Sequence, residues 1–211
     1  MDLNRRRIIQ YATFLSGAAI VPFSISALHA APNLDHSKMN TFPNNKFLPH
    51  DLKGRKTLVV YFSRTFNTAM LAKKLQHKLN ADLLEINPLN AYPEDYLETV
   101  EQARVEKQNQ SLPPLQPFPL QLSKFWKNYD TVYIGFPVWG MSPPAAIRTF
   151  LSMVEMDRKQ LFPFITHAGY GIGDSMSVLK NYAPKATLQK PFDLECDKER
   201  DTMEAVDAWL S

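Results

Sequence analysis

TLVVYFSRTFNT, residues Thr57 to Thr68, contains the clearest local signal for the fold. Its first half, Thr57 to Phe62, is an unbroken run of residues that favour β-structure, typical of a parallel strand covered on both faces. Its second half, Ser63 to Thr68, is a polar turn. Apolar residues then recur at helical spacing, at Ala69, Leu71, Ala72, Leu75 and Leu79. The stretch therefore predicts a strand, a short polar loop and a helix that ends near Asn80.

The same alternation continues to the C-terminus. Further strands are predicted over residues 81–86, 131–136, 161–166 and 187–194. Helices are predicted to start near Pro93 within 92–110, and to cover 144–154, 174–182 and 199–210. This pattern predicts a single α/β domain over residues 56–211, with a doubly wound five-stranded parallel sheet. For the strand order 2-1-3-4-5, ligands bind beyond the carboxyl ends of strands 1 and 3.

Composition excludes several classes of function. The net charge is +3, and Arg5, Arg6 and Arg7 against Asp2 supply +2 of it, which leaves +1 for the rest. A body so close to neutral has no electrostatic footprint for nucleic acid. The chain has one cysteine, Cys196, so an internal disulfide and a CxxC redox pair are excluded. The histidines lack the spacing of metal ligands, and we predict no metal site.

Residues 1–30 read as an export signal. Asn4 to Gln10 reads NRRRIIQ and is followed by a short apolar run that ends in small residues. The adjacent arginines before two aliphatic residues resemble the twin-arginine signal, which implies recognition by the twin-arginine export machinery. We expect cleavage after Ala30, because a cut after Ala31 would leave Pro32 first.

The alternative is a permanent membrane anchor. The apolar run is too short for a span of about 20 residues, and Pro22 stands directly after its last residue, Val21. We therefore expect no stable membrane span in the mature protein. Residues 31–55, rich in Asn, Pro, Lys and His, are expected to form a linker or arm. The predicted location is the periplasm of a bacterium.

The loop from Ser63 to Thr68 predicts a phosphate site. It places three hydroxyls and an amide between a strand and a helix, where helix N–H groups lack partners. The Gly-Lys-Ser/Thr ending of a Walker loop is absent. The alternative is a simple capping turn, because helix starts favour the same residue types.

Two later loops are predicted to surround an aromatic ligand. Residues 135–144 read GFPVWGMSPP, which places Trp139 beside Gly140 at a strand end. Such a tryptophan can stack on a ring, or it can simply anchor the core. Residues 167–173 read HAGYGIG, whose glycines permit a close approach of backbone to ligand. His167 is either a proton donor or a hydrogen-bonded structural histidine.

Taken in order, the three loops resemble those of the flavodoxin family. Residues 59–68 are similar to its Ser-Arg-Thr-Gly-Asn-Thr phosphate loop, with Phe66 where glycine is usual. The resemblance covers residues 57 to 210 and implies one bound FMN. It implies phosphate contacts at Ser63, Arg64, Thr65, Asn67 and Thr68. It implies flavin-ring contacts at Pro137, Val138, Trp139, Gly140 and Met141, and at His167, Ala168, Gly169, Tyr170 and Gly173. His167 and Tyr170 are the candidate catalytic residues.

A flavodoxin-like fold hosts more than one activity, so three functions stay open. The first is an FMN-dependent oxidoreductase that reduces a quinone or a similar small acceptor. The second is a one-electron carrier that docks on redox protein partners; carriers of this kind are usually strongly acidic, unlike this chain. The third is a flavin-free binding module, in which Phe66 has disabled the phosphate loop. Two features favour the oxidoreductase. The body of the chain is near neutral, and the long segment from Tyr92 to Trp126 could cover the flavin edge.

Overall fold

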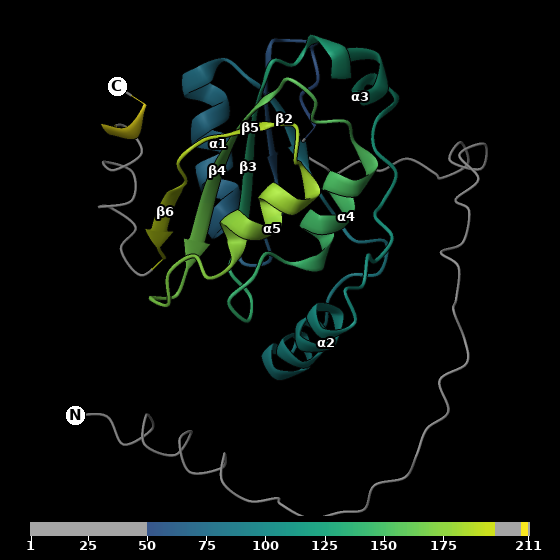
Figure 1. The fold of residues 1–211 in the computed structure, drawn as a ribbon, viewed down its shortest axis with the longest axis vertical. Coiled ribbons are helices and arrows are strands. Elements are labelled where there is room, and N and C mark those ends of the chain that lie inside the picture. The colour runs from purple at the N-terminus through teal and green to yellow at the C-terminus, as the bar shows by residue number, and fades with distance from the viewer. Residues whose placement is uncertain (1–49, 197–207, 211) are drawn as a thin grey trace, which may run out of the picture. The chain divides into compact units, whose positions relative to one another are not determined.

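The parallel sheet predicted from the sequence is present (Figure 1). The computed structural model of the chain describes residues 50–196 and 208–210. The strand order is β2-β1-β3-β4-β5, with β6 also paired to β4, and all these pairs are parallel. The strands are β1 (Thr57–Tyr61), β2 (Asp82–Glu85), β3 (Thr131–Pro137), β4 (Gln160–His167), β5 (Thr187–Leu188) and β6 (Phe192–Glu195).

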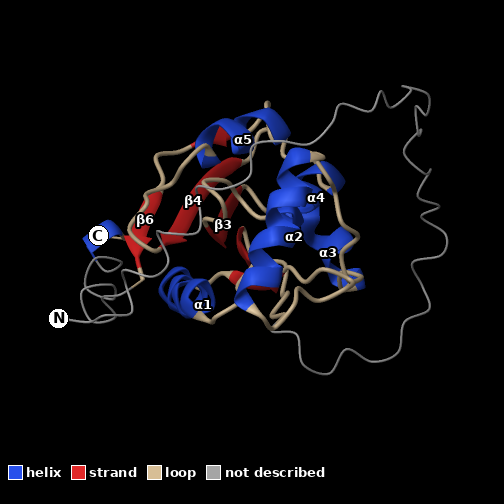
Figure 2. Cartoon of the chain, turned by 90° about the horizontal axis from the view of Figure 1, so that it is seen from below, coloured by secondary structure: helices blue, strands red, loops and turns tan. Residues whose placement is uncertain are grey.

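Helices cover both faces of the sheet. The helix α1 lies on one face, and α4 and α5 lie on the other (Figure 2). Their bounds are α1 (Asn67–Leu79), α4 (Ala145–Met153) and α5 (Ser175–Tyr182). Alternate residues of β1 serve the two layers: Leu58 and Val60 pack in the core under α4 and α5, whereas Val59 packs in the core under α1. This double burial explains why β1 is a continuous apolar run.

The fifth predicted strand consists of two short strands. The sequence predicts one strand over residues 187–194, but β5 ends at Leu188 and β6 begins at Phe192. Pro191 lies in the gap, and proline cannot donate a ladder hydrogen bond. Both pieces pair with β4, at opposite ends of that strand, so the predicted order holds.

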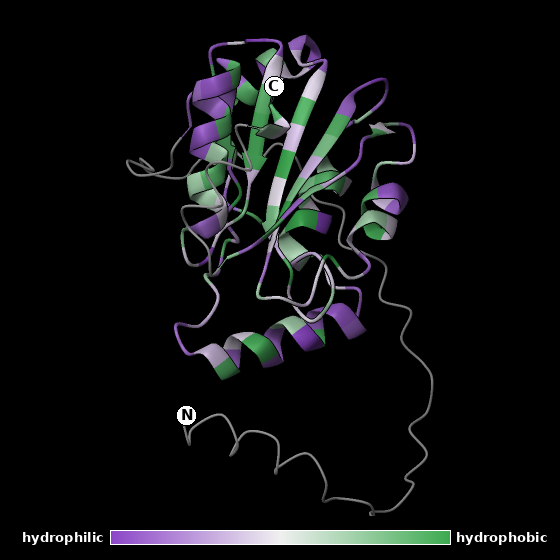
Figure 3. Cartoon of the chain, turned by 90° about the vertical axis from the view of Figure 1, so that its left-hand side faces the viewer, coloured by the Kyte–Doolittle hydropathy of each residue, from purple (hydrophilic) through white to green (hydrophobic). Residues whose placement is uncertain are grey.

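The segment between β2 and β3 contains two helices of its own. α2 (Tyr96–Gln108) begins three residues later than predicted, because the Asp95 carboxylate caps it by accepting from the Glu98 N–H at 2.9 Å. The extended stretch 112–119 then leads into α3 (Leu120–Phe125) and the short 3-10 helix η2 (Trp126–Asn128), neither of which was predicted. Figure 3 shows α2 beyond one end of the sheet, with hydrophobic and hydrophilic residues mixed along it.

The residues just before β1 are fixed to the opposite end of the sheet. The buried Asp82 carboxylate accepts from the backbone N–H groups of Lys53, Gly54 and Arg55 at 2.8, 2.7 and 3.2 Å. The Tyr129 hydroxyl donates to the same oxygen at 2.8 Å. The last part of the predicted linker therefore packs on the domain.

Several predictions fall on residues outside the described part of the chain. These are the signal over residues 1–30, most of the linker, and the helix over 199–210 except at its last residues, 208–210. Trp209 stacks on Phe192, with ring centroids 5.0 Å apart. Within the described residues, the helices are all too short or too polar to cross a membrane.

Candidate functional site

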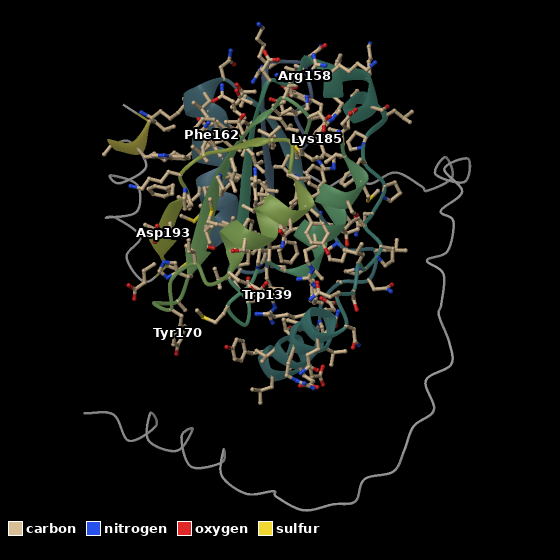
Figure 4. All side chains as sticks on the ribbon, viewed as in Figure 1. Trp139, Arg158, Phe162, Tyr170, Lys185 and Asp193 are labelled. Atoms are coloured by element: carbon tan, nitrogen blue, oxygen red, sulfur yellow. The ribbon has the colours of Figure 1, made fainter. Side chains whose placement is uncertain are left out.

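The loops that follow β1, β3 and β4 meet at the carboxyl edge of the sheet, as the topology requires. The Val138 N–H donates to the Thr166 carbonyl at 2.8 Å, and the Asp174 N–H donates to the Met141 carbonyl at 2.9 Å. Trp139 and Tyr170 lie at this edge, opposite the edge that carries Arg158 and Lys185 (Figure 4). The three predicted loops therefore form one site.

The N-terminus of α1 is open toward the first loop. Its first backbone hydrogen bond joins the Met70 N–H to the Phe66 carbonyl at 2.9 Å. The backbone N–H groups of residues 67–69 therefore have no acceptor within the helix. The N-cap side chain forms no capping bond, and the first turn carries no acidic residue. Thr65 and Asn67 are exposed beside it. This arrangement suits a phosphate dianion, because the free N–H groups and the helix dipole both attract an anion.

Two residues of the predicted phosphate set have protein partners for their side chains. The Arg64 guanidinium donates to the Glu94 carbonyl at 2.6 Å and to the Pro93 carbonyl at 3.3 Å, just before α2. The buried Thr68 hydroxyl lies 2.9 Å from the Thr166 hydroxyl. Arg64 thus joins the first loop to α2, and Thr68 joins it to the end of β4.

Phe66 adopts the left-handed conformation that glycine favours. Its φ is 65° and its ψ is −14°, and its side chain is 77 % exposed. The backbone of the loop therefore has the conformation expected of a glycine at this position, although the residue is phenylalanine. For an L-residue this conformation costs roughly 1–2 kcal/mol.

We expect the substitution Phe66→Gly to raise the free energy of unfolding by about 0.5–1 kcal/mol. Glycine relieves the backbone strain, but its greater freedom in the unfolded chain offsets part of the gain. Little burial is lost because the ring is exposed. Denaturant unfolding of Phe66→Gly and Phe66→Ala measures the effect, since alanine removes the ring and keeps the strain. Equal stability of the two variants would contradict the argument.

The second loop is a tight two-residue turn. Trp139 and Ser142 exchange two backbone hydrogen bonds, of 2.9 and 3.1 Å. Between them Gly140 and Met141 have φ values of 54° and 64°, the signature of a type I′ turn. The Lys107 ammonium of α2 donates to the Gly140 carbonyl at 2.9 Å and lies 3.4 Å from the Asp174 carboxylate. Lys107 therefore joins α2 to the second and third loops.

The third loop is held by its own histidine. The Nδ1 atom of His167 accepts from the Gly169 N–H at 3.1 Å, so the neutral ring carries its proton on Nε2. The Nε2 atom lies 3.4 Å from the Asp193 carboxylate. Gly173, with φ of 56°, packs so closely on the Met141 backbone that a Cβ would lie 2.2 Å from its carbonyl oxygen. The proton-donor role of His167 stays a prediction.

A mostly apolar cleft of about 510 Å³ lies between these loops and α2. Eight residues of the predicted set line it: Arg64, Val138, Trp139, Gly140, Met141, His167, Ala168 and Tyr170. The other predicted residues belong to the same loops but do not line the cleft: Ser63, Thr65, Asn67, Thr68, Pro137, Gly169 and Gly173. The described residues contain no group of three or more His, Cys, Asp or Glu side chains arranged to hold a metal ion.

Trp139 is both packed and accessible. Its ring meets Phe62 and Tyr92 edge to face, with centroids 5.3 and 4.8 Å away. The same side chain lines the cleft. The two roles that the sequence left open, core anchor and ligand wall, are thus compatible.

The remaining lining residues come from α2 and were not predicted individually. They are Tyr96, Thr99, Val100, Ala103, Arg104 and Lys107. Their signal in the sequence is weak, because apolar and charged side chains alternate on the helix without a clear stripe. The length of the segment from Tyr92 to Trp126 was the one usable sign that it could cover the site.

A buried polar cluster anchors the C-terminal half of α2. The buried Glu106 carboxylate accepts from the Tyr92 hydroxyl and from the Gln102 amide, each at 2.8 Å. Burial and this carboxylate raise the pKa of Tyr92, so its hydroxyl stays protonated as a donor. The buried Arg148 guanidinium of α4 donates to the carbonyls of Glu106 and Ser111 at 3.2 and 3.4 Å. The helix is thereby fixed to the body next to the cleft.

Comparisons with family models and with solved structures identify the same family. A family model described as flavodoxin matches residues 56–211. A crystal structure of a candidate flavoprotein from Bacteroides eggerthii is 31% identical, covers 74% of this chain and 95% of its own, and has a TM-score of 0.62. A flavoprotein from Lactobacillus acidophilus, solved in complex with FMN, is 25% identical, covers 71% and 99%, and has a TM-score of 0.59. No curated protein matches the chain.

Proposed function

This chain belongs to the flavodoxin family, and from that premise we propose that it is an exported FMN-dependent oxidoreductase that reduces a quinone or a similar small acceptor. The observation that carries the proposal is the uncapped N-terminus of α1 beside an apolar cleft that contains Trp139. The first feature suits the phosphate of FMN, and the second suits its ring.

The predicted cofactor agrees with the family and with the FMN complex of the Lactobacillus acidophilus flavoprotein. The phosphate would be held by the N–H groups at the start of α1, with Ser63, Thr65 and Asn67 beside it. Trp139 and the turn at Gly140 and Met141 would line the ring. FMN, when bound, accepts electrons from a donor and passes them to an acceptor.

The position of α2 favours a reductase of small molecules over a carrier. Six of the fourteen residues that line the cleft come from this helix, which therefore forms one whole wall. A wall at this place restricts approach to small molecules, whereas a carrier must bring its flavin edge close to a partner protein. The near-neutral charge of the body also favours a reductase, because carriers of this family are usually strongly acidic.

Electron transfer from the reduced, FMN-loaded protein tests this choice. We expect rapid reoxidation by 1,4-benzoquinone and slow reoxidation by a small haem protein at equal concentration, followed by stopped-flow absorbance. A preference for the haem protein would overturn the reductase proposal and favour a carrier.

Export is proposed from residues 1–30 alone, which lie outside the described residues. A protein outside the cytoplasm does not meet the cytoplasmic NAD(P)H pool, so a membrane or exported redox partner would supply its electrons. The double substitution Arg5→Lys/Arg6→Lys keeps the charge and should retain the precursor inside the cell, while Arg7→Lys should export normally. Equal export of both variants would count against the twin-arginine route.

A further inference from the structure

Large apolar side chains gather around the cleft although water can reach them. Tyr96 and Val100 of α2 are 68% and 45% exposed, and Met141 and Tyr170 on the loops are 47% and 79% exposed. All four line the cleft. Single exposed apolar residues are ordinary, but a group around one cleft marks a binding surface.

The cations of the cleft are already engaged by the protein. Arg64 donates to the Pro93 and Glu94 carbonyls. Both nitrogens of one edge of the Arg104 guanidinium donate to the Glu101 carboxylate, at 2.8 and 2.5 Å. Lys107 is held by Gly140 and Asp174. The Glu101 and Asp174 carboxylates thus offset two of the three positive charges, so the charges of the cleft give little preference for a negatively charged acceptor.

The apolar surface continues outside the cleft along the first turn of α2. Leu97 follows Tyr96 directly and is 72% exposed. This turn is held in place at its start, because Arg64 donates to the carbonyls of the two residues that precede the Asp95 cap. If the cleft holds the ring of a ligand, this fixed apolar surface beside it can bind an apolar side chain attached to that ring.

We propose that α2 forms the acceptor wall of the site and selects an uncharged quinone that carries an apolar side chain. The ring would lie between α2 and the loops with Met141 and Tyr170, and the side chain would lie against Tyr96 and Leu97. This inference rests on the proposed function, since it assigns the substrate class of the same site.

Binding of three related quinones to the full-length, FMN-loaded protein tests the proposal. They are 2-methyl-1,4-naphthoquinone, the same ring with a side chain of two isoprene units, and the 2-sulfonate of 1,4-naphthoquinone. Flavin absorbance first establishes that FMN is bound, and quenching of flavin fluorescence then gives each Kd. We expect the isoprenyl compound to bind about tenfold tighter than the methyl compound, as burying a few methylene groups would give. We expect the sulfonate to bind no tighter than the methyl compound.

Two exposed positions provide a matched pair of variants. Tyr96→Ser should remove most of the tenfold preference for the isoprenyl compound. Leu120→Ser should keep it, because Leu120 is 75% exposed on α3 and does not line the cleft. A preference that Tyr96→Ser leaves intact would show that the side chain binds without using α2, and would overturn the proposal. Loss of the preference in both variants would overturn it as well, because the effect would then not be specific to α2.

The outcomes separate this inference from the function on which it rests. A protein that takes up no FMN refutes both. A protein that takes up FMN but binds the methyl and isoprenyl compounds equally, or prefers the sulfonate, overturns only the assignment of an apolar acceptor.

Discussion

Replacing Asn67 by aspartate should weaken FMN binding about a hundredfold while leaving the folded protein at least as stable. Asn67 is the first residue of α1 and is exposed beside the uncapped N–H groups. The substitution keeps the shape and adds one negative charge. Repulsion from a nearby phosphate dianion is worth a few kcal/mol at the effective dielectric of a protein surface. The same charge stabilises the start of a helix by about 0.3–1 kcal/mol.

The opposite signs of the two effects make the result specific. A variant that is damaged in its fold loses both stability and affinity, whereas Asn67→Asp should lose only affinity. FMN titration gives the Kd, and denaturant unfolding of the FMN-free protein gives the stability. Asn128→Asp, an exposed change in η2, adds the same net charge and should leave FMN binding unchanged. Unchanged affinity in Asn67→Asp would mean that the phosphate does not bind at α1.

Replacing Arg148 by methionine should lower the free energy of unfolding by about 3 kcal/mol. Arg148 is 3% exposed, and its guanidinium donates to the carbonyls of Pro143, Glu106 and Ser111. Methionine fills most of the volume but removes the donor that these three carbonyls share, although the Glu106 carbonyl keeps the Ser111 N–H as a partner at 2.9 Å. The substitution also removes the positive charge next to Glu106: the guanidinium donates to the Glu106 carbonyl, and the side chain of that residue is buried.

The second substitution Glu106→Gln measures how far the two charges depend on each other. If the carboxylate relies on the guanidinium, the double variant should be less damaged than the sum of the two single variants. Urea unfolding of the four proteins gives this coupling. As a surface comparison, Arg158→Met should change the free energy of unfolding little, because Arg158 is exposed and lies at the opposite edge of the sheet (Figure 4). A stability loss below about 1 kcal/mol in Arg148→Met would show that the buried cluster does not anchor α2.

The sheet and its three loops were predictable because local and global signals agree. Doubly buried strands such as β1 must be apolar on both faces, and a parallel order places the loops after β1, β3 and β4 together. The structure confirms this order and brings Arg64, Trp139 and His167 to one cleft.

The parts that sequence missed have identifiable physical reasons. The helix α2 shows no apolar stripe, because its inner face lines a cleft instead of packing fully on a core. Its first turn is set by the Asp95 cap, so it starts at Tyr96 and not near Pro93. The bonds from Arg64 to the Pro93 and Glu94 carbonyls were also not predicted, because they join segments 29 and 30 residues apart. Such contacts leave no local pattern in the sequence.

A titration of the purified, FMN-free protein with FMN, followed by flavin absorbance and fluorescence, measures directly whether the protein binds this cofactor. We predict saturation at one FMN per chain, with a perturbed visible spectrum, and competition by inorganic phosphate at high concentration. A protein that does not bind FMN would refute the assignment of this cofactor, and would leave a flavodoxin-family fold that uses this cleft for another ligand.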